Sequence, residues 1–189
     1  VEVIGPEFRG RVTDAATTLE EIDWSIFDIV GIDHYRGAES AEEYVDKLNG
    51  YKVHDKPVVC MEMGCCAYVG GAKAGGGGFL VFEGVNPDGS GRFKDGVVPT
   101  RSEREQADYI ETQVKLLANN GAAGIFIFAF AAPFYTHGEG AKDLDLVSYA
   151  LVKTYPQDDA RSKSMPPWAP KESFHRVAGL FAQMDQLSA

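Results

Sequence analysis

The stretch "KPVVCMEMGCCAYVGGA" (residues 56–72) contains an almost unbroken apolar run that ends in a carboxylate. Val58, Val59, Cys60 and Met61 are typical of a buried strand, and Glu62 follows them near the end of the run. A charge in such a place is costly unless it is paired or used, because burial strips it of water. The stretch therefore predicts a buried strand with a functional carboxylate at its end.

The bulk composition excludes several classes of protein. A chain of 189 residues is long enough for one domain with a substantial core, and we expect a single domain over residues 1–189. A net charge of −10, with 18 basic residues scattered among 28 acids, argues against nucleic-acid binding. The sequence contains neither an apolar run long enough to span a bilayer nor a visible signal peptide, so we expect a cytoplasmic protein without a membrane partner.

The cysteines do not form a metal-binding or disulfide pattern. Three cysteines, of which Cys65 and Cys66 are adjacent, lack the spacing of either framework, and we expect reduced, buried thiols. The run "GGGG" at 75–78 lacks the Lys-Ser/Thr of a phosphate-binding loop, so it indicates flexibility. We predict no metal and no cofactor.

Strands alternate with helices along the chain. Ser40 with Glu43, and Ser102 with Glu105, have the spacing of helix-capping boxes. Phenylalanines at 126, 128 and 130 make the last strand apolar, and we expect them to be mostly core. The predicted strands cover 11–17, 28–37, 56–64 and 124–133, and the predicted helices cover 40–50, 102–121, 143–155 and 170–184.

This alternation predicts an α/β fold built from parallel strands covered by helices. A complete eight-stranded (β/α) barrel needs roughly 250 residues, so four units, a half-barrel, fit this chain. The connection at 65–100 is far longer than the usual βα loop of about two to six residues. We expect it to lie over the active face, with a small hairpin arm formed by "FLVFEG" and the segment after "NPDGSG". We also expect Val58, Ile32 and Phe128, or their neighbours, to face the open side of the half-barrel and to need a partner.

Several motifs together resemble a known family. "KPVVCMEMGCC", preceded by "DWSIFDIVGIDHYR" and followed by "GIFIFAFAAP", is similar to the last half of a clan A glycoside hydrolase barrel. The closer likeness is to a bacterial group of glycosidase-like barrels called abortive infection proteins. Three segments carry that likeness, "EMGCCAYVGGA", "RSEREQADY" and "LDLVSYALVK". The resemblance extends from about Arg11 to Phe181.

The resemblance implies strands five to eight of a barrel and a retaining glycosidase. Glu62 then corresponds to the clan nucleophile, and Tyr35 to the tyrosine that holds it by a hydrogen bond. Retaining enzymes need a second carboxyl group about 5 to 5.5 Å away. The clan supplies it after an asparagine on strand four, and no Asn-Glu pair occurs in this sequence, so the acid/base residue is missing from this chain. Asp33 ends the neighbouring strand and is a candidate to replace it.

Further polar and aromatic residues are expected at the carboxyl ends of the strands, where α/β folds bind ligands. We predict contacts to a carbohydrate substrate from a set of five residues: Asp33, His34, Tyr68, Phe130 and His137. The plainer interpretations are a structural carboxylate for Glu62, a packing aromatic for Tyr35 and polar rim residues for the histidines.

Two functions remain open at this stage. The first is a glycoside hydrolase, or part of one, in which Glu62 attacks the sugar. The second is a noncatalytic half-barrel that binds glycans or a protein through the same face, in phage defence. In either case we expect the open sheet to be completed by a second copy or by an N-terminal half-barrel.

Overall fold

The computed structural model describes residues 7–187, and the chain divides into two compact units. The first unit comprises the residues up to Met63 together with Gln113–Ile127, and the second comprises Gly64–Thr112 together with the residues from Phe128 onward. The start of the chain, Val1–Pro6, which entered the signal-peptide prediction, lies outside the described residues.

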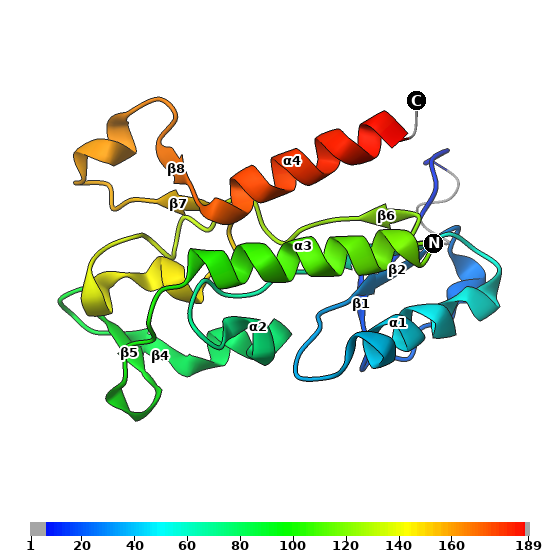
Figure 1. Cartoon of the computed structure of the whole chain (residues 1–189), viewed down its shortest axis with the longest axis horizontal. Helices are drawn as coiled ribbons and strands as arrows, with labels where there is room; N and C mark the ends of the chain where they lie inside the picture. Colours follow the sequence, from blue (N-terminus) through cyan, green and yellow to red (C-terminus); the bar gives the residue numbers. More distant parts are fainter. Residues whose placement is uncertain (1–6, 188–189) are drawn as a thin grey trace. The chain divides into compact units, whose positions relative to one another are not determined.

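The first unit is built on a four-stranded parallel sheet in the order β1-β2-β3-β6 (Figure 1). This confirms the predicted parallel α/β architecture, although the outer strands are much shorter than predicted. Strands β1 and β6 form the two edges of the sheet among the described residues. The strands are β1 (Ala16–Thr17), β2 (Val30–Asp33), β3 (Val58–Glu62) and β6 (Gly124–Ile125).

The two central strands hold the core of this unit because their apolar side chains are paired across the ladder. Val30 lies opposite Val58 and Ile32 lies opposite Cys60, and all four are buried. Ile32 and Val58 therefore do not form an open face, which corrects the prediction for these two residues. At Gly31 a Cβ atom would lie 2.1 Å from the carbonyl oxygen of Asp14, so only glycine allows this close approach.

Helix α1 (Ala41–Gly50) begins at the predicted capping box. The Ser40 hydroxyl accepts from the amide of Glu43, and the Glu43 carboxylate accepts from the amide of Ser40. Tyr44 of this helix donates its hydroxyl to the carbonyl oxygen of His34 at 2.8 Å, which ties α1 to the end of β2.

The second unit contains two small antiparallel sheets. The long stretch at 65–100 is folded, and the predicted hairpin arm is present as β4 (Phe82–Val85) paired with β5 (Gly91–Phe93). Helix α2 (Gly71–Ala74) precedes this hairpin. Strand β7 (Val152–Thr154) pairs with β8 (Trp168–Pro170).

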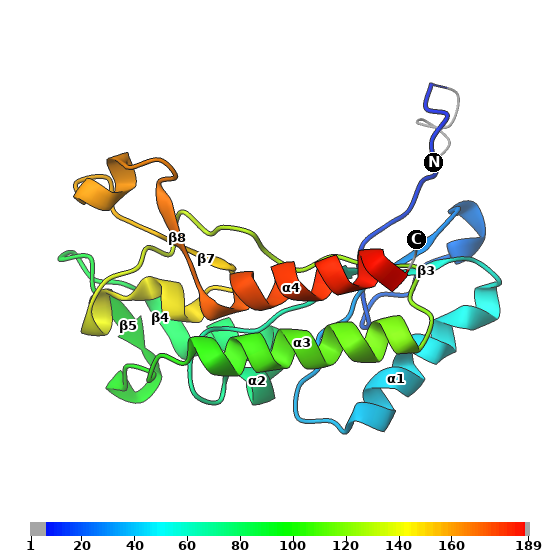
Figure 2. The same ribbon diagram turned by 45° about the horizontal axis from the view of Figure 1, so that its top comes forward.

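Helix α4 (Glu172–Leu187) runs beside the first half of α3 (Glu103–Asn119), as Figures 1 and 2 show. Arg176 of α4 bonds Asp108 and Glu111 of α3. The apolar side of α3 follows the predicted spacing, since Ala107, Ile110, Val114 and Leu117 are buried. The Ser102 hydroxyl caps this helix by accepting from the amide of Glu105.

The predicted helix at 143–155 is wrong. The segment forms a short 3₁₀ helix, η6 (Leu144–Val147), and then strand β7. Local periodicity favoured a helix, but Asp143 and Asp145 bond side chains far away in the sequence, and Val152–Thr154 pairs with β8. These long-range contacts override the local preference.

The predicted burial of the last strand is also wrong. Phe126, Phe128 and Phe130 are 58%, 42% and 50% exposed, so they are surface aromatics rather than core. The ladder of β6 ends at Ile125, and the backbone beyond it is irregular. Among the described residues, no helix has the length and apolarity needed to cross a membrane.

Candidate active site at the carboxyl ends of the sheet

Glu62 is the last residue of β3, and its side chain is held by Tyr35. The Tyr35 hydroxyl donates to Oε2 of Glu62 at 3.0 Å, which confirms the predicted hydrogen bond. Tyr35 follows the end of β2, the strand beside β3, so the parallel pairing brings the two side chains to one edge of the sheet. The carboxyl edge of such a sheet is where α/β folds bind ligands.

The backbone around Glu62 is anchored on both sides. Its carbonyl oxygen accepts from the amide of His34 at 2.8 Å, which continues the ladder past the end of β2. The Cys60 thiol also donates to this carbonyl, at 3.4 Å. Burial raises the pKa of Cys60 to about 12, so the thiol stays protonated and can act only as a weak donor.

Asp33 is the register partner of Glu62 on the neighbouring strand. Burial, and next the carboxylate of Glu62, raise the pKa of Asp33 from 3.8 to about 6. Its Oδ1 atom is buried and has no hydrogen-bond partner in the described part of the chain. The edge of the sheet thus carries two neighbouring carboxyl groups, and among the described residues Glu62 has a tyrosine donor whereas Oδ1 of Asp33 has none.

His34 is buried beneath this edge. Its side chain is 1% exposed, its Nε2 lies 2.9 Å from the carbonyl oxygen of Tyr44, and its ring stacks on the Tyr44 ring at 4.0 Å. Burial lowers the pKa of His34, so the neutral ring is favoured. This is the environment of a packing histidine that joins β2 to α1.

Tyr68, also predicted to contact substrate, lies in the core of the second unit. It is 5% exposed, and its hydroxyl donates to the carbonyl oxygen of Gly78 at 2.7 Å. Burial raises its pKa to about 12. Cys65 and Cys66, next to it, are fully buried free thiols, as predicted, and burial raises the pKa of both.

Phe130 is the most exposed of the aromatic residues predicted to contact substrate. Half of its side chain is accessible, and its ring meets Trp168 edge-on at 5.3 Å and Phe174 at 6.4 Å. A cavity of about 450 Å³ in the same unit is lined mainly by aromatic and alanine side chains, including Phe79, Phe128 and Tyr149.

His137 belongs to a charged network that the sequence reasoning missed. Its Nδ1 lies 2.9 Å from Oδ1 of Asp143, and Arg101 bonds both Asp143 and Asp145. Although burial opposes it, hydrogen bonds from His137 and Arg101 lower the pKa of Asp143 to about 2. The only signal in the sequence was two aspartates flanking a leucine in an apolar segment.

The network has the donor atoms of a metal site, but cations of the protein already neutralise it. Atoms of His137, Asp143 and Asp145 lie within 4.8 Å of one another. Arg101 engages both aspartates, and the buried ammonium of Lys171 lies 2.9 Å from Asp145. The arrangement is therefore a structural ion-pair network that links the start of α3 to the segments around η6 and α4.

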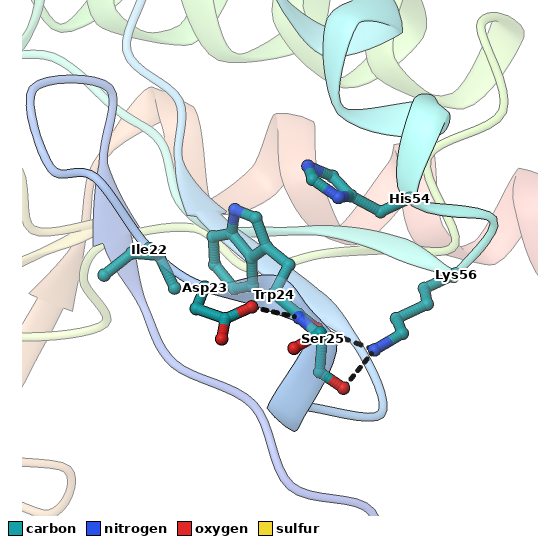
Figure 3. Close-up of a pocket in the computed structure, with 6 residues that line it drawn as sticks. All are labelled: Ile22, Asp23, Trp24, Ser25, His54 and Lys56. Carbon is teal, nitrogen blue, oxygen red and sulfur yellow. Dashed lines mark hydrogen bonds between the residues drawn. The ribbon is translucent and has the colours of Figure 1, made fainter.

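A second cavity, of about 470 Å³, is lined by Ile22, Asp23, Trp24, Ser25, His54 and Lys56 (Figure 3). Trp24 and Ser25 precede β2, and Lys56 precedes β3, so these residues lie at the amino ends of the strands. The Lys56 ammonium donates to three backbone carbonyls, those of Trp24, Ser25 and Phe27. The ammonium of Lys56 therefore stabilises the backbone, which is typical of the face of (β/α) proteins at the amino ends of the strands.

The fold is similar to part of a GH113 β-1,4-mannanase. Two structures of such a mannanase, one of them a complex, superpose with TM-scores of 0.56 and 0.55 at 20% sequence identity. The superposition covers 78% of this chain, which spans 43% of the mannanase chain. At this identity the likeness concerns the fold alone. No family model and no curated protein matches the sequence, so the likeness to the abortive infection group stays a prediction.

Proposed function

We propose that this chain is the catalytic part of a retaining glycoside hydrolase with Glu62 as its nucleophile. The observation that carries the proposal is the hydrogen bond from Tyr35 to Glu62 at the carboxyl edge of a parallel sheet. The likeness of the fold to a GH113 mannanase adds support, because that protein acts on a β-linked polysaccharide. We therefore name β-1,4-mannan as the first substrate to test.

The geometry suits a nucleophilic carboxylate. Tyr35 bonds Oε2 and fixes the rotation of the carboxyl group, which leaves Oε1 as the oxygen that attacks the anomeric carbon.

We further propose that the sheet is completed by additional strands. Strands β1 and β6 are edges, and an unpaired edge is a template for pairing. The chain spans less than half of the mannanase, so the remaining (β/α) units would come from a further segment or from a second copy of this chain.

The experiment is hydrolysis of β-1,4-mannan, xylan and cellulose by the wild-type chain and by Glu62→Gln. We expect Glu62→Gln to lower kcat/KM by several orders of magnitude with the fold intact. Glu42→Gln is the matched control, because Glu42 is an exposed carboxylate on α1, and it should leave the rate unchanged. Full activity of Glu62→Gln would reject the nucleophile. Folded wild-type protein that binds mannan without cleaving it would favour the noncatalytic half-barrel instead.

A further inference from the structure

The cavity of Figure 3 contains a buried tryptophan whose ring N–H forms no hydrogen bond. Trp24, the first residue of η1 (Trp24–Ile26), is 5% exposed and lines this cavity of about 470 Å³. Among the described residues its indole N–H meets no acceptor, and it is not one of the unbonded polar atoms that are sealed from solvent. The N–H is therefore reached through the cavity. A donor left unbonded in this way costs free energy, which a ligand oxygen would recover.

The Trp24 ring is held on several sides, so its N–H has a fixed direction. The ring centroid lies 5.9 Å from that of Phe27 and 6.5 Å from that of Tyr51, which it meets edge-on. The Lys56 ammonium holds the backbone, since it donates to the carbonyl oxygens of Trp24 at 2.6 Å and of Ser25 at 3.0 Å. A site whose groups are already in place loses little conformational entropy when a ligand binds.

Asp23 adds hydrogen-bond acceptors beside the indole donor. In Figure 3 the Trp24 ring lies between the carboxylate of Asp23 and the imidazole of His54, and all three line the cavity. Oδ1 of Asp23 accepts from the amide of Ser25 at 3.0 Å, and hydrogen bonds from Ser25 lower the pKa of Asp23, so the carboxylate is charged. A carboxylate has about four acceptor positions, so further positions stay open to a ligand.

The charges at the cavity favour an uncharged ligand. The carboxylate of Asp23 and the ammonium of Lys56 cancel each other, and Lys56 directs all three of its protons to backbone carbonyls, which leaves none for an anion. A cation would suit Asp23 but would leave the N–H of Trp24 without an acceptor. A hydroxyl group both donates and accepts, so a neutral molecule with several hydroxyls satisfies both side chains.

We propose that this cavity is a binding site for a neutral saccharide, in which Trp24 donates to one hydroxyl oxygen and Asp23 accepts from a neighbouring hydroxyl. Its volume is within the range of about 300–1,000 Å³ of small-molecule sites, and Ile22 adds an apolar wall. The site is distinct from Glu62, because Trp24 precedes β2 whereas Glu62 is the last residue of β3. It holds for any role of Glu62, and only the choice of a mannooligosaccharide as first probe rests on the proposed function.

The indole N–H of Trp24 is itself the reporter of binding. The sequence has two tryptophans, Trp24 and Trp168, so a proton–nitrogen NMR spectrum should show two indole signals, which Trp24→Phe assigns. We expect β-1,4-mannotriose to shift the Trp24 signal in a saturable way. Trp24→Phe keeps an aromatic ring without the N–H, and it should weaken binding about 3- to 10-fold, measured on the backbone amide signal of Ser25.

Asp23→Asn removes the charge but keeps the helix cap, because asparagine caps a helix as well as aspartate does. It should weaken mannotriose binding about 10-fold, measured on the Trp24 indole signal. Asp46→Asn is the matched control, because Asp46 is an exposed carboxylate on α1, and it should bind as wild type does. Equal affinities of the two variants would place the saccharide elsewhere and overturn the inference.

Inorganic phosphate and putrescine test the charged alternatives. We expect both to leave the Trp24 signal unchanged, and a shift with either of them but none with mannotriose would overturn the inference. Glu62→Gln should give the same mannotriose shift as wild type whether or not the wild-type chain hydrolyses mannan, so failure of hydrolysis and failure of this site are separate results. Loss of the shift in Glu62→Gln would show that the signal reports on the Glu62 site, which would also overturn the inference.

Discussion

Replacement of Lys171 by methionine should destabilise the second unit strongly. The Lys171 side chain is fully buried, and its Nζ lies 2.9 Å from Oδ1 of Asp145, which is 1% exposed. Loss of one partner from a buried ion pair costs about 3–5 kcal/mol, because the remaining charge stays buried. Asp145 keeps its bonds to Arg101 at 2.8 Å and to Ser148 at 3.0 Å, so we expect the lower end, about 3 kcal/mol.

The change is measured by guanidinium unfolding followed by circular dichroism. Lys153→Met is the matched control, because Lys153 forms an ion pair with Glu103 at 2.8 Å but is 20% exposed, and it should cost less than about 1 kcal/mol. Burial lowers the pKa of Lys171 despite the attraction of Asp145, so desolvation opposes the pair. If Lys171→Met is as stable as Lys153→Met, Asp145 is satisfied by Arg101 and Ser148 alone, and the reasoning is wrong.

Two further predictions concern the first unit. Ser40→Ala removes one bond of the capping box of α1 and should lower the free energy of unfolding by about 1 kcal/mol. Ser40→Asp should restore most of this stability. An unchanged denaturation midpoint for the alanine variant would show that the cap does not stabilise the helix. Sedimentation at micromolar concentration should give a mass above the 20.5 kDa of one chain, because the edges β1 and β6 and the exposed Phe126 favour association. A compact monomer would contradict the proposed completion of the sheet.

The elements with strong local signals could be predicted from the sequence. The capping box at Ser40 and the regular apolar spacing of α3 depend on residues three or four positions apart, and the structure agrees with both. The contact between Tyr35 and Glu62 was predictable for another reason. Both follow apolar runs of neighbouring parallel strands, and a resemblance to a family pointed to their pairing.

The second unit could not be predicted in the same way, because its core depends on contacts between distant residues. Arg101 bonds Asp143 and Asp145 across more than forty residues, and these bonds hold the segment that we expected to be a helix. Periodicity carries no information about such a partner. Lys171 shows the same limit, since nothing in "PKESFHR" distinguishes a fully buried ammonium from an exposed one.

The pairing of Asp33 with Glu62 lies between these cases. That each carboxylate ends a strand was visible in the sequence, because each follows an apolar run. Their position opposite each other could not be seen in the sequence, because it depends on the irregularity in the strand pairing that skips Met61. A shift of one residue exchanges the neighbour of a strand residue, so one irregular position decides whether Asp33 faces a carboxyl group or a thioether. The raised pKa of Asp33 depends on burial and on that neighbour, so the environment of this carboxyl group follows from the register of two strands rather than from a motif.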